Sequence, residues 1–342
     1  MKKLSILIPH YTEPTEVIKP LLDSIAIQRN VDMNDIEAVI CDDGPDAFLL
    51  PQEFLDSYHF DIQYHREPKA NVSVMRNKAL DYCDGEYVMF CDCDDCFWHN
   101  LAFWFILRET TTPMQIPGPN PGQVETVTGY DALYSVFIEE GRNPQTGETY
   151  FIDRRDGFQF CHGKVINKEF MLKNDIRFGD ELCIHEDNVL NAKIQACTKK
   201  IKWCERPFYL WCWRDNSVCR RDPLYIKKTY PDLIKSSDHL IDWMVKKAKF
   251  DKAKECIVSI TLDAYYTFCH PSWKTIETQE YRDKAEKCFS DYFKKWENIW
   301  KEAPDQMKMQ ISSGIRQRLV MEGMEMETET LEQFLERMKQ LP

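Results

Sequence analysis

The sequence predicts an α/β protein with a mostly parallel, doubly wound sheet, followed by a helical C-terminal domain. Over the first half of the chain, short apolar runs alternate with amphipathic segments, which is typical of parallel strands joined by crossover helices. Two of these runs, 36–41 and 87–91, lead directly into carboxylates. Ligands of open α/β sheets bind beyond the carboxyl ends of the strands, so this pattern predicts a site at that edge.

Local signals define the elements of the first domain. The first strand, 4–8, is expected to stop at Pro9, and Thr15 is expected to cap a helix over 16–28. The four Pro and two Gly of 110–122 predict a loop or lid. Further strands are expected at 36–41, 60–65, 87–90, 131–139, 150–153, 160–166, 201–203 and 208–213. Further helices are expected at 71–82, 97–108, 168–174 and 188–197.

The composition changes near residue 224, beyond which Lys, Glu and Asp alternate with spaced aromatic residues. We therefore expect a catalytic domain over 1–222 and a helical domain over 223–342. This helical domain could dimerise, bind the acceptor or contact a membrane surface. Its expected helices are 226–250, 251–269, 278–300, 305–321 and 329–339.

The net charge and the cysteine content limit which binding partners and which cellular compartment are expected. The net charge of −12 weighs against a broad nucleic-acid surface, although it does not exclude a local basic patch. No secretory signal is visible, so the 14 cysteines are expected to be reduced thiols in a cytoplasm. The longest apolar run, 101–107, is too short to span a bilayer, which takes about 20 residues. We expect no integral membrane segment, and leave open peripheral contact with the inner face of the membrane.

Three carboxylates, Asp92, Asp94 and Asp95, crowd the end of the strand at 87–90. They repel one another unless a cation lies between them. Hard oxygen ligands suit Mg²⁺ or Mn²⁺, and such an ion could hold a phosphate. Asp95 is expected to cap the helix that begins at Phe97.

The neighbouring thiols of Cys91, Cys93 and Cys96 raise the alternative of a zinc site. Alternate residues of a strand face opposite sides, and a second Cys pair at ribbon spacing is missing. Small apolar core thiols are therefore the favoured interpretation.

Six motifs follow one another in order along the first 220 residues. They are Pro9 with Tyr11; Val39-Ile40-Cys41-Asp42-Asp43-Gly44; Val74-Met75-Arg76-Asn77; Asp92-Cys93-Asp94-Asp95; Glu186-Asp187, preceded by His162-Gly163-Lys164 and Phe178; and Arg214-Asp215-Asn216-Ser217. Together they resemble the family 2 glycosyltransferases, which have the A-type nucleotide-sugar-binding fold. Thr12 and Pro45 depart from that family's pattern, which has Asn and Ser there.

The resemblance implies a role for each candidate residue. Asp94 would be the direct metal ligand, and Asp92 would contact the ribose or the metal. Asp187 would be the general base, with Glu186 and His185 beside it in the acceptor site. The implied donor-binding residues are Pro9, Tyr11, Glu13, Asp42, Arg76, Asp92 and Arg214. Among these, Tyr11 would stack on the base and Asp42 would accept a hydrogen bond from its edge, while both arginines would pair with carboxylates or the diphosphate.

The expected activity is therefore metal-dependent, inverting transfer from a nucleotide-diphosphate sugar, a UDP-sugar, to an acceptor hydroxyl. A carbohydrate or lipid-linked acceptor in surface polysaccharide or glycan synthesis is the default of that family, and Mn²⁺ or Mg²⁺ would be the cofactor. Modified DNA bases or a protein as acceptor, and a catalytically silent binding module, remain as alternatives. A nucleotidyltransferase is disfavoured because 10–13 is not a Gly-rich basic loop.

Each candidate also has a plainer interpretation. The carboxylates of Asp42 and Asp187 could cap helices, and Tyr11 could serve packing alone. His162 and His185 could be structural rather than ligands.

Overall fold

The computed structural model describes residues 2–118, 120, 122–155, 160–215, 228–270, 273, 275, 278–321 and 329–342. The chain divides into two compact units, Met1–Asp215 and Asn216–Pro342. Of the motif at 214–217, residues 216 and 217 lie outside the described residues.

Four parallel strands form the N-terminal half of the sheet in the first unit. They are β1 (Leu4–His10), β2 (Ile36–Asp42), β3 (Asp61–Arg66) and β4 (Tyr87–Phe90), in the order β3-β2-β1-β4. Every residue of β2 and β4 is buried, as expected for strands covered on both faces. The order turns back between β1 and β4, and such a switch point opens a crevice beyond the strand ends.

The rest of the sheet is mixed. β10 (Lys164–Asn167) lies antiparallel between β4 and β8 (Ala132–Arg142). β11 (Ile201–Trp211) runs parallel to β8, and the short β5 (Cys96–Phe97) runs antiparallel to β11. β9 (Thr149–Arg154) forms a hairpin with β8. The two strands expected at 201–203 and 208–213 are thus one strand, with a register shift between Cys204 and Tyr209.

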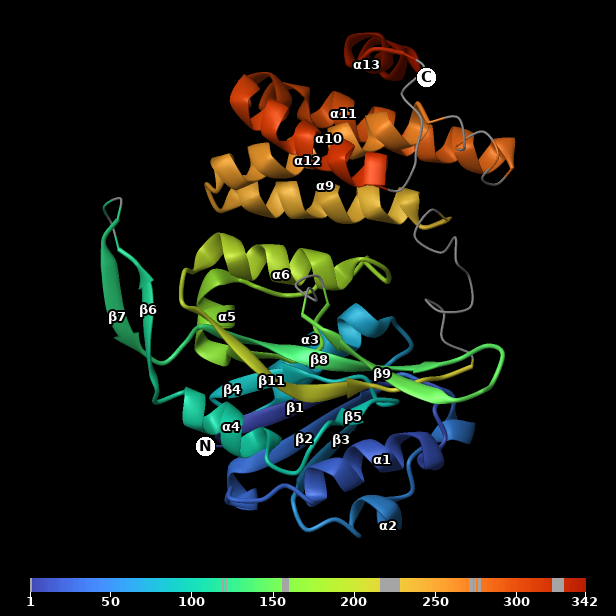
Figure 1. Ribbon diagram of the computed structural model, residues 1–342. Coiled ribbons are helices and arrows are strands. Elements are labelled where there is room, and N and C mark those ends of the chain that lie inside the picture. Colours follow the sequence, from blue (N-terminus) through green and yellow to red (C-terminus); the bar gives the residue numbers. More distant parts are fainter. Residues whose placement is uncertain are drawn as a thin grey trace. The chain divides into compact units, whose positions relative to one another are not determined.

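Helices cover both faces of this sheet (Figure 1). On one face lie α1 (Thr15–Ala26), α2 (Gln52–Leu55) and α4 (Ala102–Glu109). On the other lie α3 (Val72–Tyr82), α5 (Lys168–Asn174) and α6 (Glu186–Cys197). Two 3₁₀ turns flank β2, η1 (Met33–Asp35) and η2 (Asp46–Phe48).

Pro9 does not stop the first strand, contrary to expectation, because β1 continues to His10. The carbonyl of Leu7 accepts the N–H of Cys91, so residues 7 and 9 both turn their backbone polar groups toward β4. The pairing with β4 ends at Leu7 and Phe90. Pro9 therefore lies where the ladder requires no N–H, which is where a strand tolerates proline.

Three other local predictions were wrong. Thr15 is the first residue of α1 rather than its cap. The segment after Asp95 forms β5, and α4 begins only at Ala102. Part of the Pro-rich segment forms β6 (Pro113–Pro117), with a proline at each end, and β6 pairs with β7 (Val124–Thr128) in a two-stranded ribbon.

The second unit is helical. It contains α9 (Tyr230–Lys246), α10 (Phe250–Phe268), α11 (Gln279–Glu302), α12 (Asp305–Met321) and α13 (Leu331–Gln340). Its aromatic residues form the core, as predicted: Phe289 lies 5.5 Å from Phe334 and 6.1 Å from Phe268. Among the described residues, no helix is both long enough and apolar enough to cross a membrane.

The loops that follow β1 and β2 touch at Gly44. A Cβ added there would lie 1.6 Å from the carbonyl oxygen of Tyr11 and 3.1 Å from Oδ1 of Asp42. This contact allows only glycine and brings the ends of the two strands together.

We predict that Gly44→Ala lowers the free energy of unfolding by about 1–3 kcal/mol, because the methyl group overpacks two backbones. Urea denaturation of the full chain measures this change. The matched control is Gly314→Ala in α12, where nothing lies within 4 Å of the added Cβ. That change should raise stability by about 0.5–1 kcal/mol. Equal effects of the two substitutions would contradict the close approach at Gly44.

Candidate active site

Arg76, from the first turns of α3, lies at the centre of the acidic residues. Its side chain is 4% exposed, and it reaches carboxylates from two separate parts of the chain. Its Nη2 donates to Oδ1 of Asp92 at 2.7 Å. Its Nη1 donates to Oε1 of Glu186 at 2.8 Å and to Oδ1 of Asp187 at 3.3 Å. A buried guanidinium thus joins the end of β4 to the start of α6.

Asp92 remains ionised in this environment. Burial alone would raise its pKa, but the charge of Arg76 and the hydrogen bond from His162 outweigh burial and hold the pKa well below its usual range. Its side chain is still 31% exposed, so one part of the carboxylate faces solvent.

Asp94 pairs with Arg214 instead. Nη1 of Arg214 lies 2.7 Å from Oδ2 of Asp94 and 3.6 Å from Oε1 of Glu13. The other oxygen of Glu13 accepts the N–H groups of Tyr11 and Thr12, at 3.2 Å and 3.1 Å. Burial and the charge of Asp92 raise the pKa of Asp94 despite Arg214. A further positive charge nearby would therefore stabilise the ionised form of Asp94.

Asp95 is not a helix cap, which corrects the sequence-based prediction. Its side chain is 1% exposed, and Cys212 N donates to Oδ1 at 2.9 Å while the Tyr209 hydroxyl donates to Oδ2. Burial and the charges of Asp94 and Asp92 raise the pKa of Asp95 well above its usual range. Asp95 thus links residues 92–95, the acidic turn, to the end of β11.

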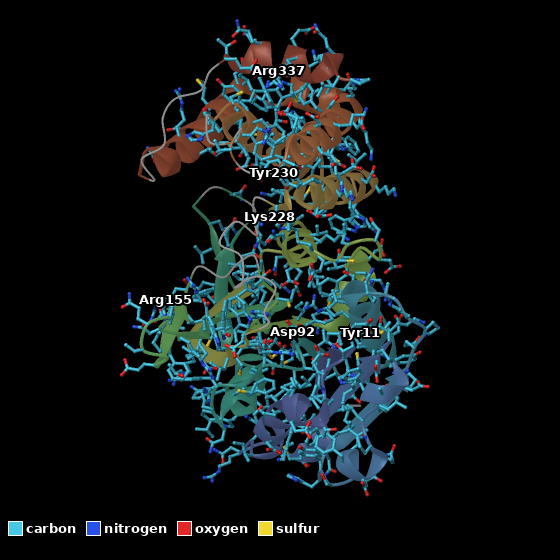
Figure 2. All side chains as sticks on the ribbon, turned by 90° about the vertical axis from the view of Figure 1, so that its right-hand side faces the viewer. Tyr11, Asp92, Arg155, Lys228, Tyr230 and Arg337 are labelled. Atoms are coloured by element: carbon cyan, nitrogen blue, oxygen red, sulfur yellow. The ribbon has the colours of Figure 1, made fainter. Side chains whose placement is uncertain are left out.

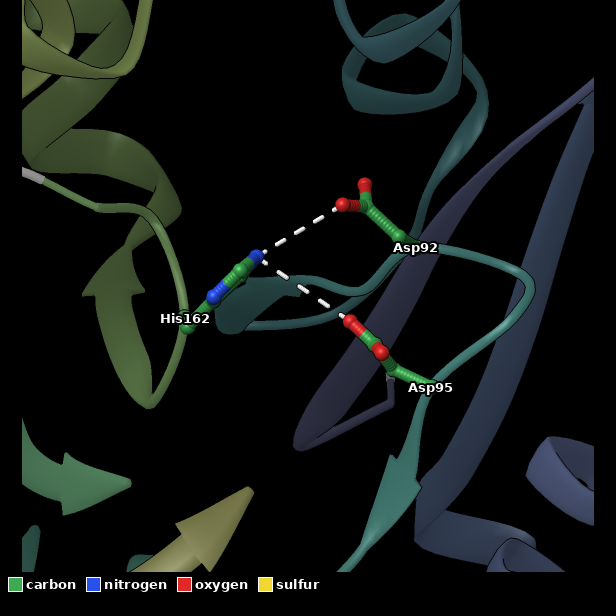
Figure 3. Close-up of side chains that lie close together, drawn as sticks. All are labelled: Asp92, Asp95 and His162. Carbon is green, nitrogen blue, oxygen red and sulfur yellow. Dashed lines mark ion pairs between the residues drawn. The ribbon is translucent and has the colours of Figure 1, made fainter. Parts of the chain in front are cut away.

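His162 completes a compact group with two of these carboxylates (Figure 3). Its ring is stacked between Tyr209, at 4.8 Å, and Phe160, at 5.8 Å. Nε2 lies 3.5 Å from Oδ2 of Asp92 and 4.0 Å from Oδ2 of Asp95. Ligand atoms of Asp92, Asp95 and His162 lie within 4.8 Å of one another.

The residues present fit a hard divalent cation. Asp92 and Asp94 come from one turn, are partly exposed and offer carboxylate oxygens, the ligand type that Mg²⁺ and Mn²⁺ prefer. Asp95 is less suited, because both of its oxygens already accept hydrogen bonds from β11 and the residue after it. Asp94 lies outside the compact group with His162 but faces the positive charge of Arg214.

Asp42, at the end of β2, is engaged by the chain itself. Gly44 N donates to Oδ1 at 2.7 Å, Arg66 Nη1 lies 2.9 Å from the same oxygen, and the Tyr64 hydroxyl donates to Oδ2. Nδ1 of His10 lies 3.3 Å from Oδ2. Although burial opposes it, the contact with His10 and the hydrogen bonds from Tyr64 and Gly44 lower the pKa of Asp42 to about 2. A hydrogen bond from a nucleobase to Asp42 would require one of these contacts to open.

Tyr11 is 39% exposed, and the ammonium of Lys69 lies 5.8 Å from the centre of its ring. Seen from the side shown in Figure 2, Asp92 lies between Tyr11 and Arg155. Pro9 lies in the last residues of β1 and Tyr11 directly follows the strand, next to the end of β4 at the switch point of the sheet. An exposed ring at this edge is available for stacking on a planar ligand.

The start of α6 carries the acceptor-side candidates. His185 precedes the helix with φ of 63°, a left-handed conformation that non-glycine residues rarely adopt. Asp187 receives the N–H of Cys161 at Oδ2, at 3.1 Å, in addition to Arg76. Both of these partners lie outside α6, so this carboxylate does not merely cap its own helix.

The side chain of Glu186 is 12% exposed and lies beside Asp187. Burial and the charge of Asp187 raise its pKa to about 7, although Arg76 opposes the shift. Glu186 can therefore hold a proton near neutral pH, which is useful for proton transfer.

Sequence reasoning missed several residues of this site. His162 occurs in a motif that was noted without a role, whereas no sequence signal pointed to Tyr209, Tyr64 or Arg66. Arg76 was expected to pair with carboxylates or with the diphosphate of the donor, and in the structure it pairs with three carboxylates.

Comparisons with known proteins agree with this architecture. Residues 5–103 match the family model "Glycosyl transferase family 2". The poly(ribitol-phosphate) beta-glucosyltransferase of Bacillus spizizenii is 22% identical over 299 residues, which make up 83% of this chain and 43% of that protein. The cholesterol galactosyltransferase of Borreliella burgdorferi is 22% identical over 320 residues, 84% of this chain and 82% of that protein. The chain thus spans less than half the length of the Bacillus relative.

Among solved structures, residues 1–349 of Staphylococcus aureus TarS in complex with UDP-GlcNAc superpose with a TM-score of 0.61. The identity is 18%, and the match covers 89% of this chain and 82% of that one. This likeness confirms the A-type fold predicted from the sequence, including its helical C-terminal region.

We predict that Glu186→Gln changes the pH dependence of stability. The folded-state pKa of Glu186, about 7, lies above its ordinary value of 4.5. The contribution of Glu186 to stability is therefore fully present below pH 4.5 and is lost as the pH rises through about 7, because the folded protein must then ionise this carboxyl group. Gln carries no charge, so the stability of the variant relative to wild type should rise by about 1–3 kcal/mol between pH 5 and pH 8. Denaturant titrations across this range measure it. A difference that does not change with pH would refute the shift.

Proposed function

Through residues 5–103 the chain belongs to glycosyl transferase family 2, and on this premise we propose that it is a metal-dependent, inverting glycosyltransferase. It moves a sugar from a UDP-sugar to an acceptor hydroxyl. The observation that carries the proposal is the pairing of Arg76 with two carboxylates. It holds Asp92, which is suited to binding a cation, next to Asp187, which is suited to act as a general base. Transfer of a sugar needs these two functions side by side.

The donor assignment rests on the edge of the sheet. Tyr11 offers an exposed ring beside the end of β1, and the TarS structure reported above was solved with UDP-GlcNAc. In this proposal Pro9 and Tyr11 line the base, and Asp42 keeps the loop at Gly44 in place through the hydrogen bonds it accepts and its ion pairs.

Asp94, with Asp92, would hold Mn²⁺ or Mg²⁺. When bound, such an ion stabilises the negative charge that develops on the departing diphosphate. Arg214 neutralises Asp94 in the structure and is partly exposed. It can therefore turn from Asp94 to the diphosphate, whose oxygens suit a guanidinium fork. Glu13 contacts Arg214 and also accepts the N–H of Tyr11. It therefore connects the movement of Arg214 to the loop that carries Tyr11.

Asp187 would take the proton of the acceptor hydroxyl as that oxygen attacks the anomeric carbon from the face opposite the diphosphate. Cys161 N–H and Arg76 fix its two oxygens in direction. Glu186 and His185 would line the acceptor side. A single displacement of this kind inverts the configuration at the sugar.

The acceptor we propose is a carbohydrate or a lipid-linked carbohydrate of surface polysaccharide or glycan synthesis. One relative is named for poly(ribitol-phosphate) and another for cholesterol, so acceptors differ among similar proteins. We propose that the helical unit, residues 223–342 of the predicted division, serves acceptor binding or dimerisation. The thiols fit a cytoplasmic protein, which can lie against the inner face of the membrane.

The proposal predicts different losses for two matched substitutions. Asp94→Asn should weaken Mn²⁺ binding by about tenfold or more, because it removes an anionic oxygen ligand. Hydrolysis of the UDP-sugar should fall with it. Asp187→Asn should bind Mn²⁺ and UDP as wild type does, while turnover falls by about 100-fold or more, because the base is lost.

Calorimetry with Mn²⁺ and UDP gives the two affinities, and UDP release from UDP-glucose, UDP-galactose and UDP-N-acetylglucosamine gives turnover. Full activity of wild type in excess chelator would remove the metal from the mechanism. Unchanged turnover of Asp187→Asn would remove that residue as the base.

A further inference from the structure

Two thiols face each other next to the acidic turn. Sγ of Cys96, on β5, lies 3.6 Å from Sγ of Cys212, which follows β11. Both residues are partly exposed. Cys91 and Cys93, by contrast, are buried within the hydrophobic core, which agrees with their interpretation as core thiols.

The strand pairing brings the two cysteines together. Cys96 lies opposite Leu210 on β11, and Cys212 comes two residues later, so the two side chains emerge on the same face of the paired strands. A disulfide needs its sulfurs about 2.05 Å apart. The thiols must therefore approach by roughly 1.5 Å, which the end of a short edge pairing allows.

Each cysteine is linked through Asp95 to the segment that carries the proposed cation ligands, Asp92 and Asp94. Cys96 follows Asp95 in the chain, and Cys212 N donates to Oδ1 of Asp95 at 2.9 Å. Two residues beyond Cys212, Arg214 pairs with Asp94 at 2.7 Å. The segment that holds Arg214 on Asp94 thus begins at one of the two thiols.

We propose that Cys96 and Cys212 form a reversible disulfide that controls the cation site. The oxidant is a low-molecular-weight disulfide such as oxidised glutathione. One protein thiolate attacks it and releases one glutathione thiolate, and the second protein thiolate then attacks the mixed disulfide and releases the other. The two protein thiols lose two electrons and two protons, and two reduced glutathione molecules result.

The disulfide acts through Arg214. If a cation is to use both oxygens of Asp94, Arg214 must move away from that carboxylate. A covalent link between Cys212 and β5 restrains the segment that has to move. Oxidation therefore keeps Arg214 on Asp94 and weakens cation binding. This consequence rests on the proposed function, whereas formation of the disulfide does not.

The experiment uses the full chain, reduced with dithiothreitol or incubated with oxidised glutathione. Peptide mass mapping identifies the disulfide, and electron paramagnetic resonance of Mn²⁺ gives the cation affinity. We expect one Cys96–Cys212 linkage, a rise of about tenfold in the Mn²⁺ dissociation constant, and recovery with dithiothreitol. Cys96→Ser and Cys212→Ser should each keep the affinity of the reduced protein under the oxidant. Cys288→Ser, a partly buried thiol of α11, should respond as wild type does.

The outcomes separate the two ideas. Absence of a Cys96–Cys212 peptide after oxidation overturns the inference, as does a disulfide that leaves the Mn²⁺ affinity unchanged. If the reduced protein binds no Mn²⁺, the metal role in the proposed function fails and control of a cation site fails with it. Peptide mapping then still decides whether the linkage forms.

Discussion

The site depends on one buried positive charge shared by three carboxyl groups. Arg76 is almost wholly removed from solvent and contacts Asp92, Glu186 and Asp187. A lone charge in such a place would be strongly disfavoured, and the carboxylates would repel one another without it. The buried guanidinium therefore requires the carboxylates, and the carboxylates require the guanidinium. The planar guanidinium is suited to the task because its two terminal nitrogens point at different partners.

The sheet topology explains why these groups meet. β1 and β4 lie side by side where the strand order turns back, so Tyr11 and Asp92 emerge at one edge. Glu186 and Asp187 come from α6, more than ninety positions later, and reach this edge through Arg76 and the N–H of Cys161. The contact of Gly44 with Tyr11, and the donors around Asp42, hold the neighbouring loops in place. The structure thus fixes both halves of a site before any ligand arrives.

The sequence predicted the parts of the fold that depend on local pattern. Buried strands are apolar throughout, so β1, β2 and β4 and the carboxylates after them could be recognised. The helix over 168–174 was predicted with the bounds of α5. The helix expected over 188–197 differs from α6 by two residues at its start. Long-range partners could not be recognised. Asp95 has good capping chemistry in the sequence, but the hydroxyl of Tyr209, 114 positions later, decides its role. His162 enters the site only because β10 is inserted between β4 and β8.

The measurement that tests the Arg76 bridge most directly is turnover of UDP-sugar hydrolysis by Arg76→Lys. Lysine keeps the charge but presents a single nitrogen, so it cannot hold Asp92 and Asp187 together. The account predicts that turnover falls by about 100-fold while UDP affinity stays within about threefold of wild type. Arg177→Lys, at the surface pair with Asp81, is the matched control and should keep full turnover. Wild-type turnover in Arg76→Lys would contradict the account.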